Sequence, residues 1–313
     1  MGVREWLMLV ALALVWGGSF FCNELALTTL PPLTVVLGRV GLAAIVLTAI
    51  VYGRGERLPT DAATWGLLLV MGLLNNVTPF GLIVWGQSRI DSGLASILNA
   101  TTPLATVLLA HWLTADEKLT RGKVAGVVFG LAGVAVLIGP AALSDIGQDL
   151  AGQLAVLAAA VSYALAGIHG RRLRRLPPLT AAAGMLIGAT VLLVPAVALL
   201  EPNAWRNFDA VSLAGVVGLA LPCTALAYGL YFAILRAAGA TNLLLVTFLI
   251  PVSAILLGAG VLGERLEPTA FAGMAFIALG LAAVDGRLAA WLGGACRSAW
   301  RAQRSGRGRR AGA

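Results

Sequence analysis

Long apolar stretches alternate with short polar connectors along almost the whole chain. Each stretch holds about 18 to 23 residues, and a helix of about 20 residues crosses a hydrocarbon core of about 30 Å. Backbone groups inside lipid must be paired within their own segment, so such stretches are expected to be helices. The pattern predicts ten spans, at residues 6–27, 33–52, 64–86, 92–113, 122–140, 151–170, 179–200, 210–234, 240–262 and 268–286.

The connectors leave no room for a soluble domain. The chain is 59% hydrophobic and 12% charged, whereas soluble domains carry about 25% charged residues. The first stretch follows Arg4, as the apolar core of a signal peptide follows a basic residue. Nine further stretches follow it, so we expect it to be a membrane span rather than a cleaved signal peptide. The three cysteines are too far apart to indicate a metal site or a disulfide framework. The sequence therefore predicts an all-α integral membrane protein.

The basic residues indicate how the spans are oriented. With the N-terminus in the cytoplasm, 18 of the 22 Lys and Arg residues fall in cytoplasmic segments and 3 in outer loops, which is the expected asymmetry. Both termini are then cytoplasmic. The net charge of +8 comes largely from a basic tail at 287–313, and attraction to anionic lipid headgroups explains this tail better than nucleic acid does.

The two halves of the chain resemble each other at an offset near 147. Pro103 matches Pro251, and the segment from Glu117 to Leu119 matches that from Glu264 to Leu266. Five spans per repeat is an odd number, so the second repeat starts from the opposite side of the membrane. Such inverted repeats are typical of secondary transporters, whose halves rock about a midplane site. A duplication without a transport role is the alternative. The expected domains are repeats at 1–140 and 141–286, followed by the tail.

Several motifs resemble the EamA branch of the drug/metabolite transporter superfamily. They are Val15-Trp16-Gly17-Gly18-Ser19-Phe20-Phe21, Leu30-Pro31-Pro32, Gly38-Arg39, and the Pro103…Glu117-x-Leu119…Gly126 pattern with its copy at Pro251…Glu264-x-Leu266…Gly273. The resemblance implies a ten-helix carrier that works by alternating access on small metabolites, often amino acids, and frequently exports them. This chain has an acid at Glu24, where many members have a basic residue, so a role at that position does not carry over.

Arg39 is the one arginine inside a predicted span. A central Arg costs about 2.5–3.5 kcal/mol on insertion scales, so it is expected to face the bundle or reach the headgroups. Glu24 lies near the outer end of the first span. One hypothesis is a Glu24–Arg39 pair that gates the outer cavity or binds a zwitterion, and the alternative is a purely structural pair.

Polar residues and prolines occur at matching places in the two halves, in the third and eighth spans and in the fourth and ninth. We expect them to line a substrate path or to bond neighbouring helices. The polar candidates are Asn75, Asn76, Asn99, Thr224, Tyr228 and Asn242, and the helix-break candidates are Pro79, Pro103, Pro222 and Pro251. Four aromatic residues are candidates for a wall of the path, with a membrane-interface position as the alternative: Trp16, Trp85, Tyr163 and Tyr231.

A secondary transporter of a small metabolite is the function that these observations favour. The sequence carries no P-loop, zinc motif or nucleophile elbow, so we expect no cofactor and no enzymatic activity. A lipid-handling membrane protein and a non-transporting scaffold or sensor are the alternatives. The expected partners are a small-molecule substrate and the lipid bilayer, and no nucleic acid. The Gly126-x-x-x-Gly130 motif predicts close helix packing within one chain, with a homodimer contact as the alternative.

Overall fold

The computed structural model describes residues 1–87, 89–90, 95, 98–115, 117–138, 149–204, 208–253 and 268–285, without the side chains of Phe20, Glu24, Pro268, Ala270 and Asp285. All regular structure in these ranges is helical. The elements are α1 (Val3–Gly17), α2 (Ser19–Leu27), α3 (Pro32–Gly53), α4 (Ala62–Gly72), η1 (Leu73–Val77), α5 (Thr78–Gln87), α7 (Thr102–Leu113), α8 (Arg121–Ile138), α10 (Leu150–His169), η2 (Gly170–Leu173), α11 (Pro178–Leu200), α12 (Ala210–Ala220), η4 (Leu221–Leu226), α13 (Ala227–Leu244) and α15 (Pro268–Asp285).

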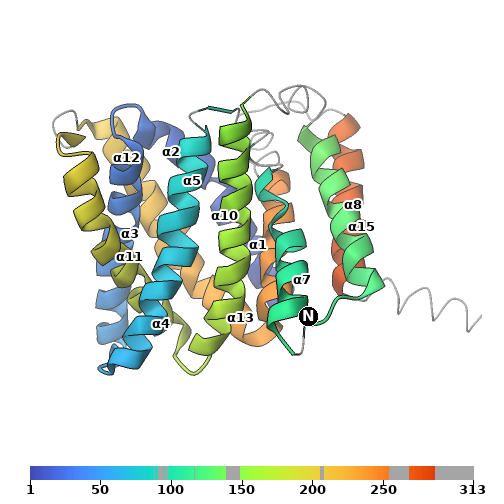
Figure 1. Cartoon of the computed structure of the whole chain (residues 1–313), viewed down its shortest axis with the longest axis horizontal. Coiled ribbons are helices and arrows are strands. Elements are labelled where there is room, and N and C mark those ends of the chain that lie inside the picture. Colours follow the sequence, from blue (N-terminus) through green and yellow to red (C-terminus); the bar gives the residue numbers. More distant parts are fainter. Residues whose placement is uncertain are drawn as a thin grey trace, which may run out of the picture.

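Six helical stretches are long and apolar enough to cross a membrane: Val3–Leu27, Pro32–Gly53, Ala62–Gln87, Leu150–Leu173, Pro178–Leu200 and Ala210–Leu244. Shorter apolar helices occur at Thr102–Leu113 and Phe271–Val284. The all-helical membrane fold predicted from the sequence is confirmed in the described ranges. These helices form one bundle of roughly aligned elements (Figure 1).

The stretch Ala210–Leu244 is two helices rather than one long one. Gly239 has φ +83° and ψ 175°, a conformation that breaks a right-handed helix and favours glycine. A second helical segment begins at Ala240 and continues through the described residues 246–253. The separation predicted between the runs 210–234 and 240–262 therefore falls at this kink.

Local chemistry defines where several helices begin. Asp61, Asp149 and Asp209 each precede a helix, and each side chain accepts a backbone N–H from the residue three positions later, at 2.7 to 2.8 Å. These bonds satisfy amides that have no partner inside the helix. Helices α3 and α11 begin instead with proline, whose missing N–H costs nothing in the first turn.

Identical pentapeptides, Leu-Pro-Pro-Leu-Thr, begin α3 at residues 30–34 and α11 at residues 176–180. The carboxylate of Glu201, at the end of α11, accepts the backbone N–H and the hydroxyl of Thr34, at 2.8 and 2.7 Å. The carboxylate of Glu56, just after α3, accepts the hydroxyl of Thr180 at 2.8 Å. Each helix start is thus bound by an acid that follows the end of the other helix. These two matched helices therefore run in opposite directions.

Helices α8 and α15 pack closely against each other at one edge of the bundle (Figure 1). A Cβ added to Gly126 would lie 2.6 Å from the Gly280 carbonyl oxygen, and one added to Gly280 would lie 2.6 Å from the Gly126 carbonyl oxygen. Only glycine permits this approach of two backbones. The prediction that Gly126 serves packing within one chain is confirmed.

Matching π-helical segments interrupt the third and eighth predicted spans. Segment η1 precedes α5 and segment η4 precedes α13, and their first residues, Leu73 and Leu221, are 148 positions apart. A π-helical turn widens the helix and leaves backbone groups for other partners, and such turns are frequent at functional sites. Pro79 lies just after η1, and Pro222 lies within η4. Pro103 lies in the first turn of α7, and Pro251 lies inside a helical stretch.

The bundle has two ends, which are named here after residues that lie at them. The Leu30 end contains the α2–α3 turn at residues 28–31. The Glu117 end contains the α7–α8 connector at residues 114–120 and, in Figure 1, the N-terminus.

Candidate functional site

A cavity lies between helices of both halves of the chain. Its walls come from α1, α2, α3 and α5 in the first half, from α10 and α13 in the second, and from residues 99 and 247–250. The α2, α3 and α5 residues that line it lie near the helix ends that meet at the Leu30 end. The cavity therefore occupies that half of the bundle.

Repeat-related residues line this cavity together. The lining contains four pairs separated by 147 or 148 positions: Trp16 with Tyr163, Phe80 with Tyr228, Ile83 with Tyr231, and Asn99 with Thr247. Matching residues from two like halves meet when the halves pack about a shared axis. The cavity thus lies at the interface between the repeats, where transporters with internal repeats place their substrate sites.

Arg39 is the only charged residue among the described residues that line the cavity. It is 6% exposed, and its Nε donates to the Thr224 hydroxyl at 2.7 Å while its Nη2 donates to the Cys223 carbonyl at 3.3 Å. Its guanidinium also lies over the Phe80 ring, 4.0 Å from the ring centre. Segment η4 presents both oxygen acceptors: its wider turn leaves the Cys223 carbonyl available, and Thr224 contributes its side-chain hydroxyl. Three neutral groups therefore fix the orientation of a buried cation.

The charge on Arg39 has no counterpart in the second repeat. The identical pentapeptides align Arg39 with Met185, which is buried against Asn75. The described positive charge of the cavity therefore comes from the first repeat.

Aromatic rings make most of the wall between α1 and α13. The Trp16 ring lies edge-on to Tyr228 with 6.3 Å between ring centres, and the Tyr228 and Tyr231 rings are 5.6 Å apart at 88°. Such edge-to-face contacts favour a rigid cluster. Trp16 Nε1 donates to the Cys223 carbonyl at 3.0 Å and the Tyr228 hydroxyl donates to Asn76 Oδ1 at 2.6 Å. These bonds fix two of the three rings.

Two polar atoms of the cavity wall have no hydrogen-bond partner among the described residues. They are the hydroxyl of Tyr231, a residue that is 1% exposed, and Oδ1 of the half-buried Asn99. Buried polar groups are nearly always bonded, because leaving one unpaired costs about 1–3 kcal/mol. Their position in the wall is suited to a ligand that supplies the missing partner.

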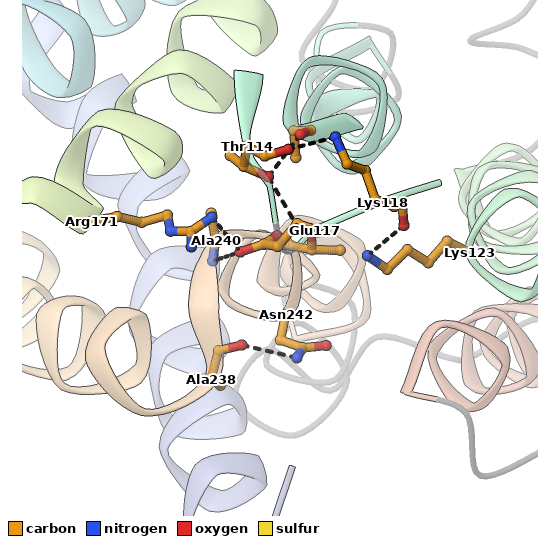
Figure 2. A network of polar contacts seen from close by, with 10 residues as sticks. Thr114, Glu117, Lys118, Lys123, Arg171, Ala238, Ala240 and Asn242 are labelled. Atoms are coloured by element: carbon orange, nitrogen blue, oxygen red, sulfur yellow. Dashed lines mark hydrogen bonds and ion pairs between the residues drawn. The ribbon is translucent and has the colours of Figure 1, made fainter. Parts of the chain in front are cut away.

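A separate polar network lies at the Glu117 end (Figure 2). The Glu117 carboxylate accepts the backbone N–H groups of Ala240 and Thr241 at 3.3 and 3.2 Å, and it also accepts the Thr241 hydroxyl. Arg171 Nη1 lies 3.4 Å from Glu117 Oε1. Since Ala240 starts the helical segment after the Gly239 kink, Glu117 binds where the helix dipole favours a negative charge. One side chain thus joins the α7–α8 connector, η2 and the kinked helix.

The structure brings only some of the candidate residues together. Seven of them line the cavity or bind Arg39: Trp16, Arg39, Asn99, Tyr163, Tyr228, Tyr231 and, through its bond to the arginine, Thr224. Asn75 and Asn76 lie behind Tyr228, whose hydroxyl contacts both.

The remaining candidates lie elsewhere. Trp85 is 41% exposed and contacts the Arg89 guanidinium outside the cavity lining. Asn242 bonds the Ala238 carbonyl at 3.0 Å and is not among the lining residues. The side chain of Glu24, and with it the predicted Glu24–Arg39 pair, lies outside the described residues.

Phe80 is the main functional residue that the sequence analysis missed. It is apolar, so no polar signal distinguished it from ordinary core residues. Its position 148 residues before Tyr228 was the signal that could have identified it.

A comparison with protein families decides the assignment. The model of the EamA-like transporter family matches the chain twice, at residues 4–139 and at residues 150–284. The chain belongs to the EamA-like transporter family. This EamA-type chain is therefore a multi-pass helical membrane transporter rather than an enzyme, and the resemblance read from its motifs is confirmed.

Several named sequences are similar to this EamA-type chain. It is 29% identical to the protein named uncharacterized inner membrane transporter YedA of Escherichia coli (strain K12), over 83% of each chain. It is 29% identical to protein PecM of Dickeya dadantii, over 84% of this chain and 86% of that one. A match to the uncharacterized transporter YoaV of Bacillus subtilis, at 27% identity, covers 54% of this chain and 58% of that protein.

A solved structure shares the fold. It superimposes with a TM-score of 0.72 at 23% identity, covering 90% of this chain and 97% of the other. At this identity the likeness concerns the fold alone.

Proposed function

We propose that this EamA-type protein is a secondary transporter that exports a small metabolite, such as an amino acid or a related compound, by alternating access. The cavity between the repeats is the observation that carries the proposal. It combines one buried cation, an aromatic wall and two unpaired polar atoms. These features are typical of a site that orients a small molecule with an apolar body.

The proposed architecture is ten transmembrane helices in two inverted five-helix repeats, at 1–140 and 141–286, followed by the basic tail. The opposite directions of the matched helices α3 and α11 support the inversion. The two family matches and the paired π-helical segments support the repeat. An odd number of spans per repeat makes such an inversion necessary.

In the proposed cycle, the structure represents the state in which the cavity is accessible from the Leu30 end. The Glu117 network holds the opposite end closed by tying η2 and the kinked helix to the α7–α8 connector. Opening that end requires Glu117 to leave at least one of these partners. Substrate release then follows from rocking of the repeats about the cavity.

Transport by the purified protein in liposomes tests the function. Liposomes preloaded with unlabelled leucine, phenylalanine, glutamate or lysine are diluted into the matching radiolabelled amino acid. Counterflow of at least one of them, absent from protein-free liposomes, is expected. The absence of protein-dependent flux for all four, with lipid movement between the leaflets instead, would turn the assignment toward lipid handling.

We also propose that the protein lies in the inner membrane with both termini in the cytoplasm. The relative named an inner membrane transporter and the distribution of basic residues support this placement. Single cysteines at the exposed positions Thr28 and Arg57 test it in a cysteine-free background. A membrane-impermeant maleimide is expected to label Thr28→Cys in intact cells and Arg57→Cys only after permeabilisation. The reverse pattern contradicts the orientation.

A further inference from the structure

We propose that the substrate is a monocarboxylate with a flat or branched apolar body, and that Arg39 binds its carboxylate. This inference rests on the transport function proposed above and specifies the chemistry of its site. The geometry around the guanidinium, the composition of the cavity wall and the two unpaired polar atoms each support one part of it.

The guanidinium has binding capacity left. Of its five N–H groups, Nε and one on Nη2 are engaged by Thr224 and Cys223 in the described contacts. Phe80 covers one face of the planar group, and the remaining N–H groups lie in its plane, along its edge. An edge with two parallel N–H groups matches a carboxylate in a two-bond arrangement.

The charge also lacks compensation in the described part of the chain. Arg39 is 6% exposed, and its partners there are a hydroxyl, a carbonyl and an aromatic ring. An isolated buried charge is unfavourable, and an ion of opposite sign recovers much of that cost. A carboxylate that enters the cavity is therefore attracted, whereas a cation is repelled.

The wall restricts the rest of the ligand. Apart from Arg39, the described lining is mainly aliphatic and aromatic, with a few neutral polar side chains. A phosphate ester or a dicarboxylate needs more than one cation, and a sugar needs many hydrogen-bond partners. An apolar body against Trp16, Tyr228 and Tyr231 fits this wall, with one further polar group near Asn99 or Tyr231.

Asn99 and Tyr231 indicate where an α-substituent of the acid would bind. Both carry an oxygen that has no hydrogen-bond partner among the described residues, and an oxygen accepts a hydrogen bond from an ammonium or a hydroxyl group. The inferred chemistry, a carboxylate on an apolar body, includes α-amino acids as well as acids without an amino group. The experiment separates these two sources.

The test compares compounds that share a body and differ in charge, using binding to the purified full-length protein in detergent by isothermal titration calorimetry. One series is phenylalanine, 3-phenylpropanoate, phenylalaninamide and 2-phenylethylamine, and the second is leucine, 4-methylpentanoate, leucinamide and isoamylamine. At least one carboxylate is expected to bind about tenfold or more tightly than the amide and the amine of its series. Tight binding of the amino acid, but not of the acid without an amino group, indicates that the site also binds the ammonium group. Tight binding of both compounds indicates that the site recognises the carboxylate alone.

Variants test whether Arg39 is responsible. Arg39→Gln is expected to lower carboxylate affinity about tenfold or more, and Arg39→Lys to restore part of it, since the charge remains and the two-bond fit is lost. Arg57→Gln is the matched control, because Arg57 is exposed and lies outside the cavity. Monodisperse elution and an unchanged helical circular dichroism spectrum show that each variant is folded.

The inference is overturned if neither carboxylate series binds, if amides or amines bind as tightly as the acids, or if Arg39→Gln binds as well as the parent. Liposome counterflow separates this failure from failure of the proposed function. Flux of a cation or a neutral compound that does not depend on Arg39 leaves the transporter assignment standing and rejects only the carboxylate site.

Discussion

Thr34 and Thr180 are matching residues of identical pentapeptides, yet they lie at opposite ends of the α3–α11 pair. Glu201 binds Thr34 and Glu56 binds Thr180. An acid that follows the end of each helix therefore binds the first turn of the other helix. The two contacts are matched, because the two helices carry the same starting pentapeptide and run in opposite directions. They stabilise the antiparallel pair from which Arg39 projects into the cavity.

Glu201→Ala is expected to lower the free energy of unfolding by about 1–2 kcal/mol, because two backbone N–H groups of α3 lose their cap. Thermal unfolding of the purified protein in detergent measures this. A double-mutant cycle with Thr34→Val provides the control, since the two changes share a contact and are expected to be less than additive. Full additivity would mean that the Thr34 hydroxyl bond contributes nothing.

Gly239→Ala is expected to destabilise the protein by about 1–3 kcal/mol, because alanine is strained at positive φ. An added Cβ would also lie 2.9 Å from Glu117 Oε1. Gly53→Ala is the matched control, because Gly53 ends α3 with nothing within 4 Å of the added Cβ. Equal melting temperatures for the two variants would contradict the constraint at the kink.

Glu117→Gln is expected to open the Glu117 end more often, because the neutral amide loses the ion pair with Arg171 and weakens the bonds to Ala240 and Thr241. In a cysteine-free background, the reaction rate of Ala238→Cys with a small maleimide reports this opening. The rate is expected to rise several-fold in Glu117→Gln. An unchanged rate, with the same melting temperature, would show that Glu117 does not hold this end closed.

Tyr228→Phe and Tyr231→Phe form a pair with different expected outcomes. The first removes the 2.6 Å bond to Asn76 and is expected to cost about 1–2 kcal/mol of stability. The second removes a hydroxyl with no described partner, so stability is expected to stay the same or to rise, while ligand affinity falls. Thermal unfolding and calorimetry measure the two effects. A large loss of stability in Tyr231→Phe would show that its hydroxyl is bonded within the protein.

Stability is expected to fall at acidic pH because of the helix-capping aspartates. The backbone N–H groups of Thr64, Gly152 and Ser212 hold the pKa values of Asp61, Asp149 and Asp209 below the ordinary value of 3.8. A carboxyl whose pKa is lower in the folded state stabilises the fold above pH 3.8, and this contribution is lost as the pH falls through the folded-state pKa. Melting temperatures between pH 3 and pH 6 measure the effect. The triple Asp→Asn variant is expected to show a weaker dependence of the melting temperature on pH. An unchanged dependence would contradict the role of these aspartates.

The sequence alone was sufficient for the all-helical fold, the similarity of the two halves and the family. An apolar run of span length has few other ways to satisfy its backbone in lipid, so Pro32–Gly53 could be predicted to within a residue or two. The matching Pro103 and Pro251 segments revealed the repeat, because a repeat can be recognised by aligning the two halves of the sequence. The single intramembrane Arg39 stood out for the same reason, since an unusual residue type is visible without a structure.

Only the tertiary structure decided which side chains share the cavity. Trp16 and Trp85 are both tryptophans in predicted spans, yet one lines the cavity and the other lies on the outside with Arg89. Phe80 gave no sign of its contact with Arg39, and Glu117 gave none of its bonds to a helix start more than 120 residues away. The physical reason is that hydropathy fixes a helix in the membrane but not its rotation about its own axis. That rotation is set by packing against residues distant in the chain.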